Sequence, residues 1–169
     1  MTTPRETLVA YLRDAYAMEQ EALSILDRQI QRAGSQPHLA DRLRRHRDET
    51  EHQAERLEAA LHRMGADTSA LKTMGAKLSG FVQAALTGMA DDEVVKDLMA
   101  AYTYEQWEAV NYRIIAVVAE EAGEPEVRRL AEESLAEELA MAEWLDGQVA
   151  PVTRAYLARS GGNEGVLTA

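Results

Sequence analysis

The stretch DDEVVKDLMAAYTYEQWEAVNYRIIAVVAEEAG, residues 91–123, contains no proline and no glycine before its last residue, which predicts one long helix. Apolar side chains recur along it at helical spacing and mark the face that is buried. They are Val94, Leu98, Tyr102, Ala109, Tyr112 and Ala116. Glu105 falls at the centre of this apolar stripe and Glu108 on its flank. Two carboxylates are therefore aimed into a protein core.

Start and stop signals predict three more long helices. Thr3, Pro4 and Glu6 form a helix start, with a capping hydroxyl, a proline in the first turn and a glutamate three residues after the cap. Glycines end the predicted helices, and Pro125 opens the last one, in which Pro151 predicts a kink. The four expected helices cover about residues 4–33, 36–64, 91–122 and 125–158.

The connections between these helices predict the fold. The first two helices and the last two are separated by short turns, so each pair packs antiparallel. Residues 66–90 are interrupted by glycines and read as a long amphipathic crossover with one or two short helices. Two hairpins joined by a long crossover are the connectivity of ferritin-like four-helix bundles. The sequence thus predicts an all-α, ferritin-like bundle over residues 1–160 and a flexible tail over residues 161–169.

Composition limits the classes of function. The chain has 169 residues and a formal net charge of -11, which disfavours nucleic acid as a partner because a phosphate backbone would be repelled. It has no cysteine, so disulfides and thiolate metal sites are excluded and a metal ion would need carboxylate or imidazole ligands. No apolar run is long enough to span a membrane. We expect a cytoplasmic protein without membrane or nucleic-acid partners.

The first and fourth predicted helices each repeat the pattern of an inward carboxylate. Glu19 lies at the centre of the apolar stripe of the first helix, and Glu138 lies within the stripe of the fourth, with Glu137 at its edge. Burial of an isolated carboxylate costs several kcal/mol, so converging carboxylates need pairing, protonation or a cation. A hard divalent metal ion satisfies this need. We expect Glu19, Glu105 and Glu138 to converge on one centre.

The second predicted helix contains HRDETEH, residues 46–52, in which two histidines compete as nitrogen ligands. Glu49 and His52 have the Glu-x-x-His spacing of di-iron bundles. A helical wheel drawn on the apolar residues instead places His46 inward, Glu49 at the margin and His52 toward solvent. His46 and Glu49 are therefore the preferred pair, and His52 is a reserve ligand. The alternative for His46 is a histidine that packs beside the core and bonds to a neighbour.

The candidate site combines residues from all four helices. Tyr16 and Tyr112 lie within a turn or two of the proposed ligands and are candidates to hydrogen-bond to them, although such tyrosines are more often simply part of the core. No glycine-rich phosphate loop or nucleophile elbow accompanies them in the sequence. The candidate metal ligands are Glu19, His46, Glu49, His52, Glu105, Glu108 and Glu138.

Four segments of the sequence resemble the YciE/YciF-type branch of ferritin-like bacterial stress proteins. The resemblance covers about residues 5–150 and rests on AYAMEQ around Glu19, HRDETEHQAERLE around Glu49, YEQWEAVNY around Glu105 and ESLAEELAMAEWL around Glu138. It implies a rubrerythrin-like bundle, a dimer and a di-metal centre. The ligands that it implies are Glu19, Glu49 with His46 nearby, Glu105, Glu108 and Glu138.

Three positions depart from the pattern of that family. Gln106 stands where the family commonly has histidine, and Ala142 stands where it commonly has aspartate. Met141 follows Glu138 at the spacing of a ferritin-type Glu-x-x-His, and a thioether is a poor ligand for iron. Ligands for a second metal ion are therefore fewer, and the sequence leaves open whether one ion or two bind.

Several functions are compatible with such a site. The leading expectation is metal binding, with di-iron or mononuclear iron first and manganese or zinc as alternatives. Iron oxidation or peroxide consumption in stress protection would follow from an iron centre. The alternative is a metal-free structural or interaction bundle in which the glutamates are protonated or bonded to tyrosine hydroxyls. A DNA-compacting protein of the starved-cell type is disfavoured by the acidic charge.

The third predicted helix also predicts self-association. Between Trp107 and Ala119 it is apolar on nearly every face, and Trp107, Val110, Ile114 and Val117 lie on the side opposite the bundle interior. An apolar face that a short crossover covers only in part marks an interface. We expect a two-fold homodimer through the back of this helix or through the crossover packed against it.

Overall fold

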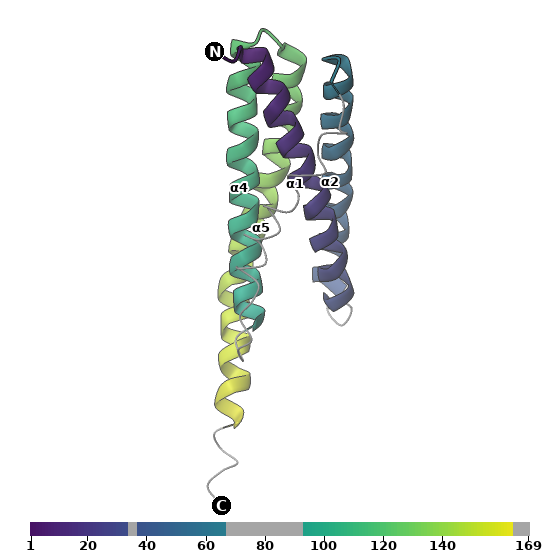
Figure 1. Ribbon diagram of the computed structural model, residues 1–169. Helices are drawn as coiled ribbons and strands as arrows, with labels where there is room; N and C mark the ends of the chain where they lie inside the picture. Colours follow the sequence, from purple (N-terminus) through teal and green to yellow (C-terminus); the bar gives the residue numbers. More distant parts are fainter. Residues whose placement is uncertain (34–36, 67–92, 164–169) are drawn as a thin grey trace, which may run out of the picture.

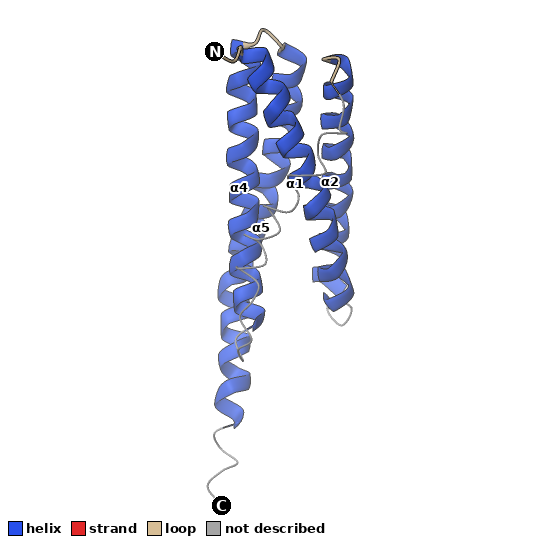
Figure 2. Cartoon of the chain, viewed as in Figure 1, coloured by secondary structure: helices blue, strands red, loops and turns tan. Residues whose placement is uncertain are grey.

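The computed structural model describes residues 1–33, 37–66 and 93–163, and these residues form four helices and no strand (Figure 1, Figure 2). The helices are α1 (Pro4–Arg32), α2 (Pro37–Arg63), α4 (Glu93–Glu121) and α5 (Pro125–Asn163). The prediction of an all-α four-helix bundle is confirmed. Nearly all of the predicted crossover, and the last residues of the predicted tail, lie outside the described residues.

Helix α1 starts as its sequence predicts. The Thr3 hydroxyl accepts a hydrogen bond from the Glu6 amide (3.2 Å), and the Thr3 amide donates to the Glu6 carboxylate (2.8 Å). At two other helix ends, Gly65 and Gly123 adopt φ angles of 72° and 70°, which glycine reaches without the steric cost of a side chain. These glycines let the chain turn after α2 and after α4.

The direction of each helix gives the connectivity of the bundle (Figure 1). α1 and α2 form one antiparallel hairpin, and α4 and α5 form the other. The end of α2 lies beside the start of α1, where Arg5 donates to the Met64 carbonyl oxygen (3.3 Å). α4 starts at the opposite end, where Asp97 pairs with Arg32 near the end of α1 (3.7 Å). The end of α2 and the start of α4 therefore lie at opposite ends of the bundle, as in ferritin-like proteins.

The four helices enclose two apolar clusters with a polar layer between them. Contacts are extensive between α4 and α5, between α1 and α2 and between α1 and α4, but sparse between α2 and α5. The upper cluster, at the end where α1 starts, is centred on Leu8, Leu12, Met18, Leu57, Leu61, Tyr112 and Ile115. The lower cluster, nearer the start of α4, contains Leu26, Ala33, Ala40, Leu43, Met141 and Leu145. The helix segments between these two sets supply the polar layer.

Two details differ from the sequence-based expectation. α5 continues to Asn163, past the expected end near Ala158, and it includes Pro151, where the kink stays a prediction. Arg154, Ala155, Leu157, Ala158 and Arg159 after Pro151 are good helix formers, and the last turns of α5 extend beyond the other helices (Figure 1). Trp107, expected on the outer face, is half-buried against the upper cluster. Its ring centroid lies 5.6 Å from that of Tyr104. A large ring can reach the core from the flank of a helix.

None of the helices in the described ranges combines the length and the apolar character that crossing a membrane needs.

Candidate metal centre

The polar layer brings together buried polar side chains from all four helices. They are Glu19 from α1, His46, Thr50 and Gln53 from α2, Glu105 and Glu108 from α4, and Ser134 and Glu138 from α5. The three carboxylates expected to converge, Glu19, Glu105 and Glu138, all point into the interior rather than to solvent. The helical wheel therefore oriented these three side chains correctly.

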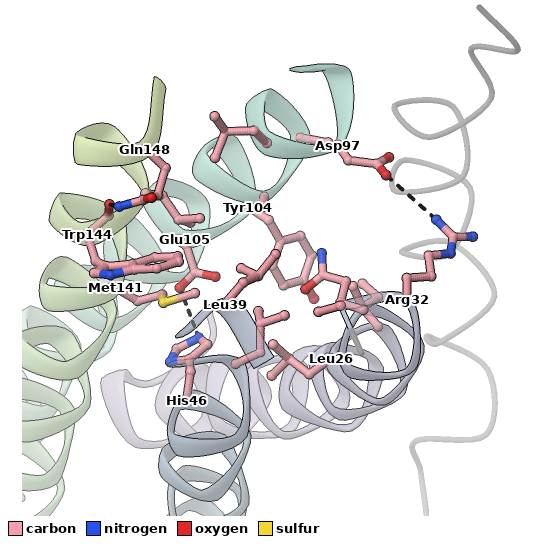
Figure 3. Close-up of a pocket in the computed structure, with 18 of the residues that line it drawn as sticks. Leu26, Arg32, Leu39, His46, Asp97, Tyr104, Glu105, Met141, Trp144 and Gln148 are labelled. Carbon is pink, nitrogen blue, oxygen red and sulfur yellow. Dashed lines mark hydrogen bonds and ion pairs between the residues drawn. The ribbon is translucent and has the colours of Figure 1, made fainter. Parts of the chain in front are cut away.

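Four residues of the layer form a compact cluster. His46, Glu105, Glu108 and Glu138 each present one nitrogen or oxygen atom, and these atoms lie within 4.8 Å of one another. His46 Nε2 lies 3.1 Å from Glu105 Oε2 and 3.9 Å from Glu138 Oε2. Figure 3 shows the imidazole of His46 turned toward the Glu105 carboxylate. We call these four residues the His46 cluster.

Glu49 holds His46 from outside the cluster. Nδ1 of His46 donates to Glu49 Oε2 (3.1 Å), and the same oxygen pairs with Arg42 (3.3 Å). That hydrogen bond lowers the pKa of Glu49 and leaves Nε2 of His46 to face the cluster. Carboxylates orient metal-binding histidines in this way. Of the preferred pair, the structure places His46 in the cluster and Glu49 behind it.

Charge is crowded in the layer. Burial by itself would lower the pKa of His46, but the carboxylates around it, first of all Glu105, raise that pKa to about 10. Burial raises the pKa of Glu19 to about 8, against the lowering effect of a tyrosine hydrogen bond. Burial and then neighbouring carboxylates raise the pKa values of Glu108 and Glu138 well above their ordinary value. A cation in the layer would favour the ionised carboxylates and so oppose these upward shifts.

Three of the four buried glutamates have one carboxylate oxygen without a hydrogen-bond partner, and the fourth pairs with His46. The three atoms are Glu19 Oε2, Glu108 Oε1 and Glu138 Oε2, whereas Glu105 Oε2 lies 3.1 Å from His46 Nε2. A buried carboxylate oxygen without a partner is costly, and a hard divalent cation can satisfy it. With the imidazole of His46 these oxygens make a donor set of the kind that Fe(II) or Mn(II) accepts. The residues present therefore fit a metal ion.

Two tyrosines lie close to the cluster, and only one of them was predicted. The Tyr112 hydroxyl donates to Glu19 Oε1 (2.5 Å), so this tyrosine holds a candidate ligand. Tyr16 is half-buried against the upper cluster, in keeping with the alternative that it is part of the core, and its pKa is raised by burial and by Glu58. Tyr104 is the second tyrosine close to the cluster. Its ring lines the cavity below the cluster, and its hydroxyl donates to the Met18 carbonyl oxygen of α1 (3.2 Å).

His52 is exposed on α2 and lies outside the His46 cluster. Six residues turn a helix by roughly 240°, so His46 and His52 cannot share a face. Seven residues bring the chain back to within about 20° of the starting direction, which puts Gln53 on the face of His46. The helical wheel was right about His52, and the same wheel contains the signal for Gln53.

Gln53 and Arg56 are the residues of the layer that sequence reasoning missed. Gln53 is fully buried, and its Nε2 donates to Glu138 Oε1 and to Glu137 Oε2, the latter at 2.8 Å. Arg56 donates to Glu137 Oε2 (2.5 Å) and to the Ser134 hydroxyl (3.1 Å). These bonds tie α2 to α5, the two neighbouring helices with the sparsest contact.

Residues 3–158 match the family described as a domain of unknown function, DUF892. The chain belongs to the DUF892 family. A crystal structure of a protein from Xanthomonas campestris pv. campestris is 32% identical and superposes with a TM-score of 0.78 over 94% of this chain and 99% of that one.

Two more distant structures share the fold. The stress protein YciF of E. coli is 21% identical, with a TM-score of 0.76 over 91% of this chain and 99% of its own. YcfI of Rhodopseudomonas palustris is 24% identical, with a TM-score of 0.67 over 86% of this chain and 94% of its own. The predicted resemblance to YciE/YciF-type proteins is confirmed.

The structure also places the positions at which this DUF892 chain departs from the expected ligand pattern. Ala142 and Met141 are buried beside Glu138 on α5, and Gln106 is half-buried on α4. The Met141 side chain belongs to the lower cluster rather than to the polar layer. α5 therefore contributes one buried carboxylate, Glu138, to the His46 cluster.

A cavity of about 660 Å³ extends from the cluster toward the end of the bundle where α4 starts (Figure 3). Its wall is mostly apolar and includes Leu26, Leu39, Met141 and Trp144. His46, Glu105 and Glu108 line it from the polar layer. The cavity therefore adjoins three of the four residues of the His46 cluster.

Proposed function

We propose that this protein binds a divalent metal ion in the polar layer, and that the ion is iron. The observation that carries the proposal is a set of four buried glutamates, three of them with a carboxylate oxygen that has no partner, around an imidazole that a fifth carboxylate orients. An apolar core tolerates such a set only when protons or a cation neutralise it. Oxygen and imidazole donors suit iron and manganese best, with zinc also accommodated.

Each residue has a stated role in this proposal. His46, through Nε2, and the carboxylates of Glu105, Glu108 and Glu138 bind the ion directly, since their donor atoms lie within 4.8 Å of one another. Glu19 supplies a further carboxylate, held by Tyr112. Glu49 keeps the proton on Nδ1 of His46 and so leaves Nε2 as the donor to the metal.

The proposal extends to an activity in stress protection. A bound ferrous ion supplies electrons that oxygen or peroxide can accept, so iron oxidation or peroxide consumption is the activity we propose. The cavity admits small oxidants to the candidate ligands, while its apolar wall keeps the approach poorly hydrated. We place this activity in the cytoplasm, in keeping with a chain that has no cysteine.

Metal content tests the proposal. Protein stripped with a chelator and loaded anaerobically with Fe(II) is expected to retain iron after desalting, as measured by elemental analysis. Glu105→Gln removes one charged ligand and is expected to weaken iron affinity at least about tenfold. Glu143→Gln, an exposed position on α5, is the matched control and is expected to bind as the wild type does. Equal binding by both variants would contradict the proposed site.

A metal-free structural or interaction bundle is the second candidate. It is favoured by the hydrogen bond from Tyr112 to Glu19 and by a Glu19 pKa near 8, which keeps that carboxyl largely protonated at neutral pH. YcfI, for which a structural role has been suggested, has the same fold. Iron content near zero after anaerobic loading would favour this candidate over the metal site.

We also propose a homodimer through α4. Val110, Ile114 and Val117 are 45%, 45% and 62% exposed along one face of this helix, and pairing two such faces would bury them. Ile114→Asp is expected to give a monomer mass by light scattering at micromolar concentration. Val149→Asp, at an equally exposed apolar position on α5, is the control and should leave the mass unchanged. A monomeric wild type would contradict the dimer.

A further inference from the structure

We propose that the polar layer holds a single metal ion rather than a pair, and that Gln53 is the residue that sets this number. The inference rests on the metal binding proposed above and concerns the stoichiometry of the same site. The inference is argued from the carboxylate oxygens that already accept hydrogen bonds from the protein's own donors.

The first step is the hydrogen bonding of Glu138. Gln53 Nε2 donates to Glu138 Oε1, which leaves Oε2 as the oxygen without a partner, 3.9 Å from His46 Nε2. Two metal ions in one site lie about 3.5–4 Å apart and share carboxylates that bridge them through both oxygens. A bridge through Glu138 would have to form at an oxygen that already accepts the Gln53 amide, so the hydrogen bond favours Glu138 as a ligand to one ion through Oε2.

Glu19 is limited in the same way. Its Oε1 accepts the Tyr112 hydroxyl at 2.5 Å, and its Oε2 is the oxygen without a partner. The two buried glutamates of α1 and α5 therefore each offer one oxygen to an ion. The carboxylates of α1 and α5 therefore supply oxygens for one ion and have no second oxygen free of a hydrogen bond for a bridge.

The orientation of the Gln53 amide is fixed by its surroundings. Oε1 of Gln53 has no hydrogen-bond partner, yet a flipped amide would place this oxygen against carboxylate oxygens of both Glu137 and Glu138. Oxygen facing oxygen is repulsive, so the amide nitrogen keeps its place toward the two carboxylates. An N–H donor cannot bind a cation.

Arg56 places a positive charge on the same side of the layer. Its guanidinium is held by Glu137 at 2.5 Å and by the Ser134 hydroxyl at 3.1 Å, one turn of α2 beyond Gln53. A cation placed on the α2–α5 side would meet this charge as well as the amide N–H group. Met141, one turn after Glu138 on α5, is buried, and its thioether is a poor ligand for a second ion of this kind.

Manganese binding tests the inference. Wild-type protein titrated with Mn(II) is expected to bind about one ion per chain by calorimetry and elemental analysis, with the EPR spectrum of an isolated ion. Gln53→Glu replaces the amide donor by a carboxylate, frees Glu138 Oε1 and is expected to bind about two ions with an exchange-coupled spectrum. Gln20→Glu adds the same charge at an exposed position on α1 and is expected to remain at one ion.

The outcomes separate this inference from the proposed function. A wild type with two coupled ions overturns the inference and leaves metal binding intact, whereas a wild type that binds none overturns the metal site itself. Gln53→His offers a neutral nitrogen ligand in case the glutamate variant does not fold, and it too is expected to bind two ions. Folded variants that still bind one ion would overturn the role of Gln53.

Discussion

The upper and lower apolar clusters use the same kinds of side chain and yet enclose very different amounts of space. In the upper cluster Leu8, Leu12, Leu57 and Leu61 are all 0% exposed. In the lower cluster the buried residues are fewer, and half-buried Leu39, Leu98 and Trp144 surround the cavity of about 660 Å³. The comparison indicates that one end of the bundle supplies stability and the other gives access to the polar layer.

The difference has a source in the helix pairs. α1, α4 and the upper part of α5 bring leucines and alanines into close contact around Tyr112, so little space is left. Farther down, the cavity leaves the lower end less filled among the described residues. The His46 cluster lies at the boundary, with a packed wall above it and the cavity below.

Truncation of one leucine in each cluster should give the largest contrast. Leu57→Ala leaves a hole in the closed upper cluster and is expected to lower the free energy of unfolding by about 2–5 kcal/mol. Leu39→Ala removes a half-buried side chain from the cavity wall and is expected to cost less than about 1.5 kcal/mol. Urea unfolding measures both. Equal losses would show that the lower end is as well packed as the upper.

The polar layer should make the metal-free protein less stable as pH rises. The pKa of Glu19 is about 8 in the folded protein against 4.5 ordinarily, and that of His46 is about 10 against 6.5. Both groups bind protons more tightly when folded. The stability from Glu19 is complete below pH 4.5 and is lost as pH rises toward 8, and that from His46 is lost between 6.5 and 10.

Thermal melts of chelator-treated protein should therefore show a melting temperature that falls between about pH 5 and about pH 9. Glu19→Gln should reduce the fall in melting temperature in the lower half of this pH range, and Glu143→Gln should not. Loading with Fe(II) should also flatten it, because a cation replaces the protons. A melting temperature that rises over this range would rule out a metal-free layer held by protons.

A smaller effect is expected from the helix start at the upper end. Thr3→Ala removes the side-chain oxygen that accepts from the Glu6 amide and should destabilise the protein by about 1 kcal/mol. Thr103→Ala, at an exposed position within α4, removes a hydroxyl that bonds to its own helix (2.8 Å) and should be close to neutral. Chemical denaturation of the two variants side by side measures the contrast.

The smallest effect is expected from the ion pair at the lower end. Arg32 and Asp97 lie 3.7 Å apart with side chains 67% and 35% exposed, so solvent screens their attraction. Arg32→Gln should change the free energy of unfolding by no more than about 0.5 kcal/mol, and less in high salt. A loss of several kcal/mol would show that this pair, rather than the upper cluster, holds the two hairpins together.

Much of the layer was predictable from the sequence, because a carboxylate in an apolar stripe is conspicuous. Glu19, Glu105 and Glu138 are buried as their positions predict, and the helical wheel preferred His46 to His52. The wheel succeeds because each of these helices is long and regular, so angular position along the sequence is preserved in space. That these residues bind a metal ion remains a prediction.

Other features depend on contacts between helices, which no single helix encodes. Arg56 was missed because its partners lie on α5. Gln53 lies on the face of His46 in the helical wheel, but it was missed because an amide suggests neither a metal ligand nor a core residue. Tyr16 was expected beside the ligands, but the position of its ring depends on how α1 packs against its neighbours. Trp107 was assigned to the wrong side for the same reason.

The position of the polar layer between two apolar clusters has a further consequence for alignment. If one helix slid along its neighbours by a single turn, about 5.4 Å, its carboxylate or imidazole would move into an apolar cluster and lose its partners. Leucines and alanines would tolerate the same slip with modest repacking. The polar layer therefore fixes how the four helices align along the bundle axis. The residues proposed to bind an ion also select one alignment of the four helices among several that the leucines alone would allow.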